Sequence, residues 1–453
     1  LGDVYKRQGK LEFVLSAAGA SVGLGNIWRF PYLAAKYGGG IFLLIYILLA
    51  LTFGYTMIVA ETSLGRMTRK SPVGAFASFT KSHTLKAGGW INAIIPILIV
   101  PYYSVIGGWV IKYLFEYICG NGTKLAEDGY FSMFISDGVS AEICFIVFAL
   151  ITLTIIFAGV RNGIERVSKF MMPILVVLSV IIAIYSVTRP GALKGIQYFL
   201  VPNLENFSWM TVVSAMGQMF YSLSIAMGIL VTFGSYMKKE TSIENSTRNV
   251  EVFDTAIAIM AGLMIIPAVF AFSGGDPNTL QAGPSLMFIT IPKVFASMGL
   301  GTVVGILFFV LVLFAAVTSS IALTESAVST FEDELHWNRK KSTVVIGIIM
   351  LALGTLSSLG YGPLDAVKIL GMQFLDFFDF LTNSVMMPIA AIATCLLVSR
   401  VIGVDRIEEE MTQEGGTFRR KKIFVMMIKY LCPVFAAIIL ISSVMNAFGL
   451  ISM

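Results

Sequence analysis

The sequence predicts an all-α polytopic membrane protein with about eleven transmembrane helices, because apolar stretches long enough to cross a bilayer recur along it. Hydrophobic residues make up 57% of the chain and charged residues 13%, whereas a soluble domain carries roughly 25% charged residues. The mean hydropathy is +0.83. Lipid is therefore expected to surround most of the molecule, and we expect a single transmembrane domain over residues 1–453.

The predicted spans follow the apolar stretches, each bounded by polar or charged residues. We expect them at residues 11–35, 40–66, 88–118, 140–159, 165–187, 209–236, 249–272, 300–331, 343–360, 367–399 and 422–448.

Lysine and arginine alternate between the loops in a way that predicts orientation, since positive residues resist translocation. With a cytoplasmic N-terminus, one side collects Lys6, Arg7, Lys10, Arg66, Arg69, Lys70, Arg161, Arg166, Lys169, Lys238, Lys239, Arg248, Arg339, Lys340, Lys341, Arg406, Arg419, Arg420, Lys421 and Lys422. The opposite loops hold Lys124, Arg189, Lys194 and Lys293. The net charge of +5 thus indicates an inner-membrane topology and not nucleic-acid binding.

The first span contains residues that are costly at membrane depth. Glycines at 19, 23 and 25 precede Asn26 and Arg29, and each glycine weakens a helix by about 1 kcal/mol relative to alanine. An unwound turn here would free carbonyls to coordinate a cation. The alternative is a G-x-x-x-G packing motif, which explains the glycines but leaves Asn26 and Arg29 unexplained.

The sixth span has a comparable interruption between Gln218 and Gly228, where Ser222 and Ser224 could instead bond back to the preceding turn. The two interrupted spans open successive five-span blocks, which predicts two inverted repeats at 11–187 and 209–399 with an additional helix at 422–448. Matching interruptions in two repeats indicate a transporter's binding site near the midplane.

The polarity of broken helices suits an amino acid carried with sodium. Helix N-termini favour a carboxylate, whereas unwound carbonyls favour a cation. Asp254, expected inside span 7, needs a counter-charge where no Lys or Arg is expected, and sodium supplies one; alternatively, span 7 starts later and Asp254 is solvated. Hydroxyls at Thr318, Ser319 and Ser320 add oxygen ligands, although helix packing also explains such a run.

Further charged residues are expected to gate the site. Arg29 would pair, directly or through water, with Asp376 or Asp379 above it, and Glu61 would accept from unwound backbone N–H groups. The four cysteines and two histidines form no metal or disulfide pattern. Because no catalytic set or phosphate loop occurs either, the sequence argues against an enzyme.

These motifs closely resemble the neurotransmitter:sodium symporter family. The resemblance rests on Gly19 to Pro31 with Gly38 to Gly40 after it, Gln218 to Gly228, Ala315 to Ser320 and Phe331 to Glu334, in the family's order and spacing. Eleven spans match its bacterial branch. The resemblance implies sodium-coupled symport of an amino acid by alternating access, with two Na⁺ ions.

The resemblance also implies which residues bind. One sodium would lie at Ser21, Asn26, Ser222 and Asp254 with the substrate carboxylate, and the other at Gly19, Val22, Ala315, Thr318 and Ser319. The substrate would meet Ser21, the amides of Gly23 and Gly25, Ile99, Tyr103, Tyr221, Ser222, Ser224, Met227, Ser319 and Leu323. Met227 stands where a phenylalanine is frequent in the family, and a flexible thioether adapts to different side chains, which favours a hydrophobic or aromatic amino acid.

Chloride-dependent members bind the anion through groups that match Tyr46, Gln218 and Ser222 plus a span 7 hydroxyl. Here Ala258 replaces that hydroxyl, and Asp254 lies one turn away. A fixed carboxylate would supply the negative charge, so no chloride is expected.

Two departures from the family concern the inner side. The N-terminal arginine and tryptophan that close it against the acidic partner matching Asp333 are absent from Leu1 to Lys10. Gly163 precedes Pro173 by ten residues, a spacing that permits span 5 to unwind in some members; helix capping by Gly163 is the alternative.

An amino-acid receptor or regulatory homologue that does not transport is the alternative function, and a channel is a third. The expected partners are the amino-acid substrate and membrane lipid, without nucleic acid, and the expected assembly is a monomer or weak dimer.

Overall fold

The computed structural model describes residues 22–274 and 285–450, and within these ranges the chain is built of helices without a β-strand. Nine of the described helices are long and apolar enough to cross a membrane. They are Gly40–Thr68, His83–Ile118, Gly138–Phe157, Asn162–Val187, Ile243–Ser273, Gly301–Glu334, Arg339–Leu359, Phe374–Ile402 and Lys421–Ala447. The predicted all-α membrane fold is confirmed.

The sixth predicted span consists of two half-helices. The first half, α12, covers Trp209–Ser222, and the second half, α13, covers Ile229–Tyr236. Between them the backbone leaves the helical region, with positive φ at Ser224, Ala226 and Gly228. Such angles cost energy for residues that carry a Cβ and persist only where surrounding contacts hold them. The interruption predicted for this span is therefore present.

The described part of the first span starts at Val22 and becomes helical from Leu24 onward. A π-helical turn at Gly25–Arg29 leads into α2, Phe30–Lys36. Gly19 and Ser21, both predicted to bind sodium, lie outside the described residues.

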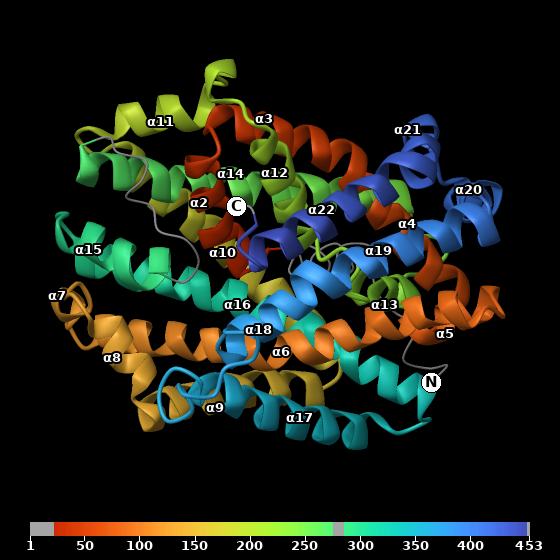
Figure 1. Ribbon diagram of the computed structural model, residues 1–453, viewed down its shortest axis with the longest axis horizontal. Helices are drawn as coiled ribbons and strands as arrows, with labels where there is room; N and C mark the ends of the chain where they lie inside the picture. The colour runs from red at the N-terminus through yellow and green to blue at the C-terminus, as the bar shows by residue number, and fades with distance from the viewer. Residues whose placement is uncertain (1–21, 275–284, 451–453) are drawn as a thin grey trace.

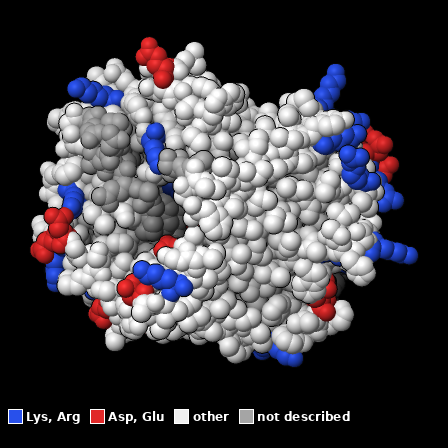
Figure 2. All heavy atoms as spheres, in the orientation of Figure 1, with Lys and Arg blue, Asp and Glu red and all other residues white. Residues whose placement is uncertain are grey.

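Short helices cover the two ends of the bundle, as Figure 1 shows. At one end lie α7 (Gly122–Leu125), α8 (Tyr130–Ser136), α11 (Ala192–Leu200) and α15 (Ile291–Ala296). At the other lie α5 (Pro72–Phe79), α20 (Val404–Thr412) and α21 (Lys421–Met426). Figure 2 shows most charged side chains of the visible face near these ends, with a broad uncharged band between them that matches a lipid-facing belt.

Two helices start earlier than hydropathy alone predicts. The seventh span, α14, begins at Ile243 because the Ser242 side chain caps it, accepting from the amide of Asn245 at 3.3 Å. The ninth, α17, begins at Arg339 behind an Asn338 cap that accepts from Lys341 at 2.9 Å. The early start of α14 carries Asp254 three turns into the helix.

The remaining long helices, and the shorter helical segments within the spans, form the rest of the bundle. They are α3 (Gly40–Leu49), α4 (Tyr55–Thr68), α6 (His83–Ile118), α9 (Gly138–Phe157), α10 (Arg166–Val187), α16 (Gly301–Glu334), α18 (Phe374–Asp379), α19 (Met387–Leu396) and α22 (Cys432–Ala447). Gly163 lies inside a π-helical turn, Val160–Glu165, where an added Cβ would come 2.1 Å from the Ile155 carbonyl oxygen. Close approach, and not helix capping, thus accounts for this glycine.

Candidate functional site

A small central cavity lies where the two broken spans meet spans 3 and 8. Its volume is about 30 Å³, and it is lined by Gly23, Gly25, Asn26, Ile99, Tyr103, Tyr221, Ser224, Met227, Ile229, Ser319 and Leu323. All residues predicted for the substrate are among these except Ser222, which faces Asp254 instead, and Ser21. The structure thus brings together residues up to 300 positions apart in the sequence, while their role in binding stays a prediction.

The two glycines in the described part of the first span are required by close approach. A Cβ on Gly25 would fall 2.3 Å from the Tyr221 ring, and one on Gly23 would fall 2.7 Å from the Ser319 hydroxyl. Tyr103 closes the same corner, since its hydroxyl accepts from the Leu24 amide at 3.4 Å. The backbone of the broken span therefore lies directly against the cavity. Its main-chain groups are close enough to contact a ligand there.

The carboxylate of Asp254 lies at the centre of a buried polar network. It accepts from the Asn26 amide at 2.9 Å, from the Ser222 hydroxyl at 2.5 Å and from the Tyr46 hydroxyl at 2.6 Å. Asp254 is 0% exposed, so the alternative of a solvated Asp254 does not hold.

Within the described part of the chain, every hydrogen-bond partner of Asp254 is neutral. A buried charge that lacks an opposite charge is strongly unfavourable. Carboxylate and hydroxyl oxygens suit a hard cation, and the Asn26 amide turns its nitrogen to Asp254 while its oxygen accepts from the Gly23 amide at 3.3 Å. Three of the four residues predicted for the first sodium, Asn26, Ser222 and Asp254, thus converge, and Ser21 is not described.

The second predicted sodium site joins the first and eighth spans. The Ser319 hydroxyl lies 3.3 Å from the Val22 carbonyl oxygen and donates to it. The Thr318 hydroxyl donates to Phe314 and Ala315 carbonyls at 3.0 and 3.1 Å, the back-bonding pattern of a helical threonine. The Ser319 hydroxyl therefore joins the two spans, while Thr318 bonds to Ala315 within the eighth span.

The residues matching the family's anion site surround Asp254. Tyr46 and Ser222 bond to each other at 3.0 Å as well as to the carboxylate, while Gln218 donates to the Gly25 carbonyl at 3.2 Å. The side-chain oxygen of Gln218 is buried without a partner. Ala258 is fully buried and offers no side-chain donor.

An outer cavity of about 790 Å³ opens above the central one. Tyr221 lines both cavities, and Arg29, Asp376 and Asp379 line the outer one. None of the ion pairs between described residues includes Arg29; its guanidinium lies 5.5 Å from the Tyr221 ring centroid. Arg29 therefore forms no direct ion pair with Asp376 or Asp379 among the described residues, and the water-bridged pair stays a prediction.

The two aspartates have different partners, none of which the sequence had indicated. Asp379 accepts from Tyr102 at 3.2 Å and from Asn383 at 2.5 Å. Asp376 accepts from Tyr361 at 3.2 Å. Tyr102 and Asp379 are 277 residues apart, so only the fold reveals their contact, whereas Tyr361 and Asp376 are 15 residues apart.

Glu61 and Asp333 both accept from backbone amides. The Glu61 carboxylate accepts from Ala226 within the interruption at 2.8 Å and is 0% exposed. Asp333 accepts from the Ser71 amide, at the start of α5, at 2.9 Å. The family's N-terminal arginine and tryptophan, which would face Asp333, are absent from Leu1 to Lys10, and these residues lie outside the described part of the chain.

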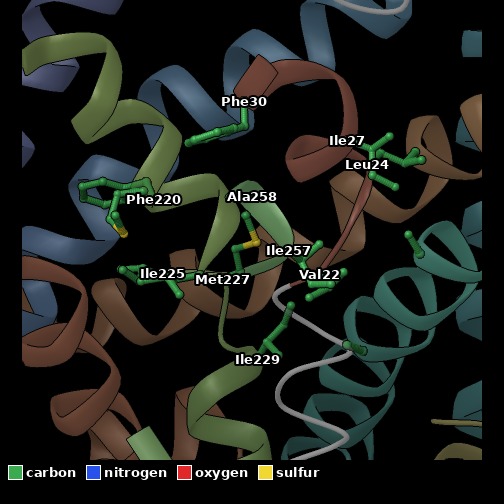
Figure 3. Close-up of a cluster of buried hydrophobic side chains, with 14 of the residues drawn as sticks. Val22, Leu24, Ile27, Phe30, Phe220, Ile225, Met227, Ile229, Ile257 and Ala258 are labelled. Carbon is green, nitrogen blue, oxygen red and sulfur yellow. The ribbon is translucent and has the colours of Figure 1, made fainter. Parts of the chain in front are cut away.

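An apolar cluster packs around the interruption of the sixth span. Figure 3 shows Met227 and Ile229 in this cluster together with Val22 and Leu24 of the first span. Ile229 lines the cavity but was missed from the sequence. The signal was present, because Ile229 is the residue at which the helix resumes after Gly228.

Comparison with known proteins agrees with this geometry. The model of the sodium:neurotransmitter symporter family matches residues 5–123 and 132–450. A Bacillus subtilis protein described as an uncharacterized sodium-dependent transporter is 33% identical over 449 residues, covering 98% of this chain and 97% of the relative. Human sodium- and chloride-dependent GABA transporter 2 is 27% identical, over 90% of this chain and 74% of the human protein.

A solved structure is similar over nearly the whole chain. The crystal structure of MhsT in complex with L-phenylalanine superposes with a TM-score of 0.86 at 34% identity, covering 96% of this chain and 98% of MhsT. The chain therefore belongs to the sodium:neurotransmitter symporter family.

Proposed function

We propose that this transporter carries a hydrophobic or aromatic amino acid into the cell by symport with two sodium ions. The observation that carries the proposal is the convergence of Asn26, Ser222 and Asp254 in a buried network beside a cavity formed by two broken spans. A sodium ion there neutralises Asp254 and attracts the substrate carboxylate. Binding both ligands at one place couples their affinities.

The lining of the central cavity supports an apolar substrate side chain. Ile99, Met227, Ile229 and Leu323 are buried there, while polar groups lie toward the backbone of the first span. The related MhsT has been solved with L-phenylalanine. By this likeness we infer that the substrate is a hydrophobic or aromatic amino acid, held by its carboxylate at the Gly23 and Gly25 amides and the Tyr103 hydroxyl.

The second sodium would bind oxygens of Val22, Ala315, Thr318 and Ser319 together with the predicted Gly19. Because it would link spans 1 and 8, its arrival and release would change how these spans pack. Alternating access then follows: the outer cavity closes when Arg29 approaches an aspartate, and the inner half opens.

We infer that transport does not depend on chloride. The support is that Tyr46 and Ser222, which match residues of the anion site in chloride-dependent members, donate to the Asp254 carboxylate. A carboxylate in this position offers the negative charge that a chloride ion would add.

We propose that the protein lies in the cell's inner membrane. In the proposed orientation its N-terminus is in the cytoplasm. The support for this orientation is the concentration of Lys and Arg in alternate loops. Membrane lipid would surround a monomer or weak dimer.

Counterflow in proteoliposomes tests transport directly. Vesicles loaded with unlabelled phenylalanine or leucine should take up the labelled amino acid when sodium is present on both sides. A protein that binds the amino acid with sodium dependence but shows no counterflow would be a receptor or regulatory homologue.

A further inference from the structure

We propose that Ile229 is the specificity-determining floor of the central cavity and limits how long a substrate side chain can be. This inference rests on the proposed function. It concerns a residue that neither the sequence motifs nor the sodium sites include.

The position of Ile229 follows from the way the sixth span is broken. Tyr221 at the end of α12 lines both the central and the outer cavity, so it lies on the outer side of the central one. Ile229 is the first residue of α13, the inner half-helix, and lines the central cavity alone. The two residues therefore lie at opposite ends of the space in which a substrate would lie.

The backbone that carries Ile229 has little freedom to move. Gly228 precedes it with φ of 70°, and a Cβ at Gly228 would come 2.8 Å from the Asn92 carbonyl oxygen and from the Pro72 ring. The chain is thus tightly packed against α6 and α5 at this point. A side chain attached to the next residue keeps its place when a ligand enters.

Ile229 also differs from its neighbour Met227 in stiffness. A β-branched side chain in a helix has one strongly preferred χ1 rotamer, whereas methionine rearranges easily. Both are buried, at 1% and 4% exposure, and Figure 3 shows both in the apolar cluster at the interruption. Met227 is therefore an adaptable wall and Ile229 a fixed floor.

Because the cavity is small, the side chain at position 229 should limit the length of the substrate side chain. Shortening Ile229 to alanine removes three side-chain carbons from the wall of the central cavity. A single methylene in an apolar pocket changes discrimination by about 10- to 200-fold.

The experiment compares Ile229→Ala and Ile229→Val with Ile225→Ala in the purified full-length protein. Ile225 is the matched control, since it is fully buried in the same interruption but does not line the cavity. Sodium-dependent binding of alanine, valine, leucine, phenylalanine and tryptophan is measured for each variant by radioligand competition.

We expect Ile229→Ala to raise affinity for the longest side chains relative to alanine by about tenfold or more. Ile229→Val should shift the same ratio by less, and Ile225→Ala should leave it unchanged. If Ile229→Ala does not fold, the change of this affinity ratio in Ile229→Val tests the inference instead.

An unchanged ratio in the folded Ile229 variants would overturn the inference, as would an equal shift in Ile225→Ala. These results leave the proposed function standing. Absence of sodium-dependent amino-acid binding in the unaltered protein would instead overturn the proposed function and this inference with it.

Discussion

The Tyr46 hydroxyl donates a 2.6 Å hydrogen bond to Oδ2 of Asp254. Ser222 and Asn26 both donate to the other carboxylate oxygen, at 2.5 and 2.9 Å. The three donors come from three different spans, so the carboxylate ties spans 1, 2 and 6 to span 7. The same contacts fix the position of this carboxylate beside Asn26, which lines the central cavity.

Removing the negative charge of Asp254 should create a need for chloride. In Asp254→Asn the side chain keeps its shape and its contact with Tyr46, but the negative charge is gone. We expect binding of phenylalanine in sodium gluconate to be weakened at least tenfold and partly restored by sodium chloride. The unaltered protein should bind equally in both salts, and chloride-stimulated uptake by it would contradict the account.

Loss of the Glu61 carboxylate should destabilise the interruption of the sixth span. Glu61 accepts from the Ala226 amide at 2.8 Å, and Ala226 has a positive φ that its surroundings must hold. Glu61→Ala would strand a buried N–H at a cost of about 1–3 kcal/mol, whereas Glu61→Gln keeps an acceptor oxygen. In detergent, the melting temperature should fall clearly for Glu61→Ala and less for Glu61→Gln. Equal melting temperatures for the two variants and the unaltered protein would refute this role.

A buried ion pair should stabilise the end of the bundle at which α20 lies. Arg66 in α4 contacts the Glu410 carboxylate in α20 at 2.6 Å, with side chains 2% and 8% exposed, and donates to the Thr241 carbonyl at 2.6 Å. Removing one partner of such a pair costs about 3–5 kcal/mol. We therefore expect Glu410→Ala to lower the melting temperature markedly.

The same helix offers a control for this ion pair. Glu408 pairs with Lys421 at 2.5 Å, but their side chains are 37% and 41% exposed, and exposed pairs contribute about 1 kcal/mol or less. Glu408→Ala should melt close to the unaltered protein. An equal drop in melting temperature for Glu408→Ala and Glu410→Ala would show that the contact between Glu410 and Arg66 does not stabilise the fold specially.

The outer gate should depend on Asp379 more than on Asp376. Both line the outer cavity with Arg29, but Asp379 accepts from Tyr102, the neighbour of Tyr103 in the central cavity, whereas Asp376 accepts from Tyr361. A thiol reporter at Ser384, in the outer cavity, should be protected from modification when sodium and substrate are added. Asp379→Asn should reduce that protection and Asp376→Asn should preserve it; the reverse order would assign the gate to Asp376.

Much of the fold follows from the sequence because hydrocarbon imposes long apolar helices. The break in the sixth span was readable from Gly228 and its serines, and the residues of the central cavity from the family motifs. Helix starts were placed less well, since hydropathy ignores the caps at Ser242 and Asn338.

Other contacts could not be predicted from the sequence. Tyr102 contacts Asp379 because α6 packs against α18, a helix that lies 277 residues further along the chain at this contact. Ile229 enters the cavity because the chain turns at Gly228, and no local pattern encodes the depth of a pocket. Arg66 and Glu410 are 344 residues apart, and charge alone does not identify such a pair.

Sodium-driven accumulation in proteoliposomes tests the central claim most directly. An inward sodium gradient should make the unaltered protein accumulate phenylalanine or leucine above its external concentration, while Asn26→Ala and Asp254→Ala should lose this dependence on sodium. Accumulation that ignores the sodium gradient, or sodium dependence retained in both variants, would contradict sodium-coupled transport through this site.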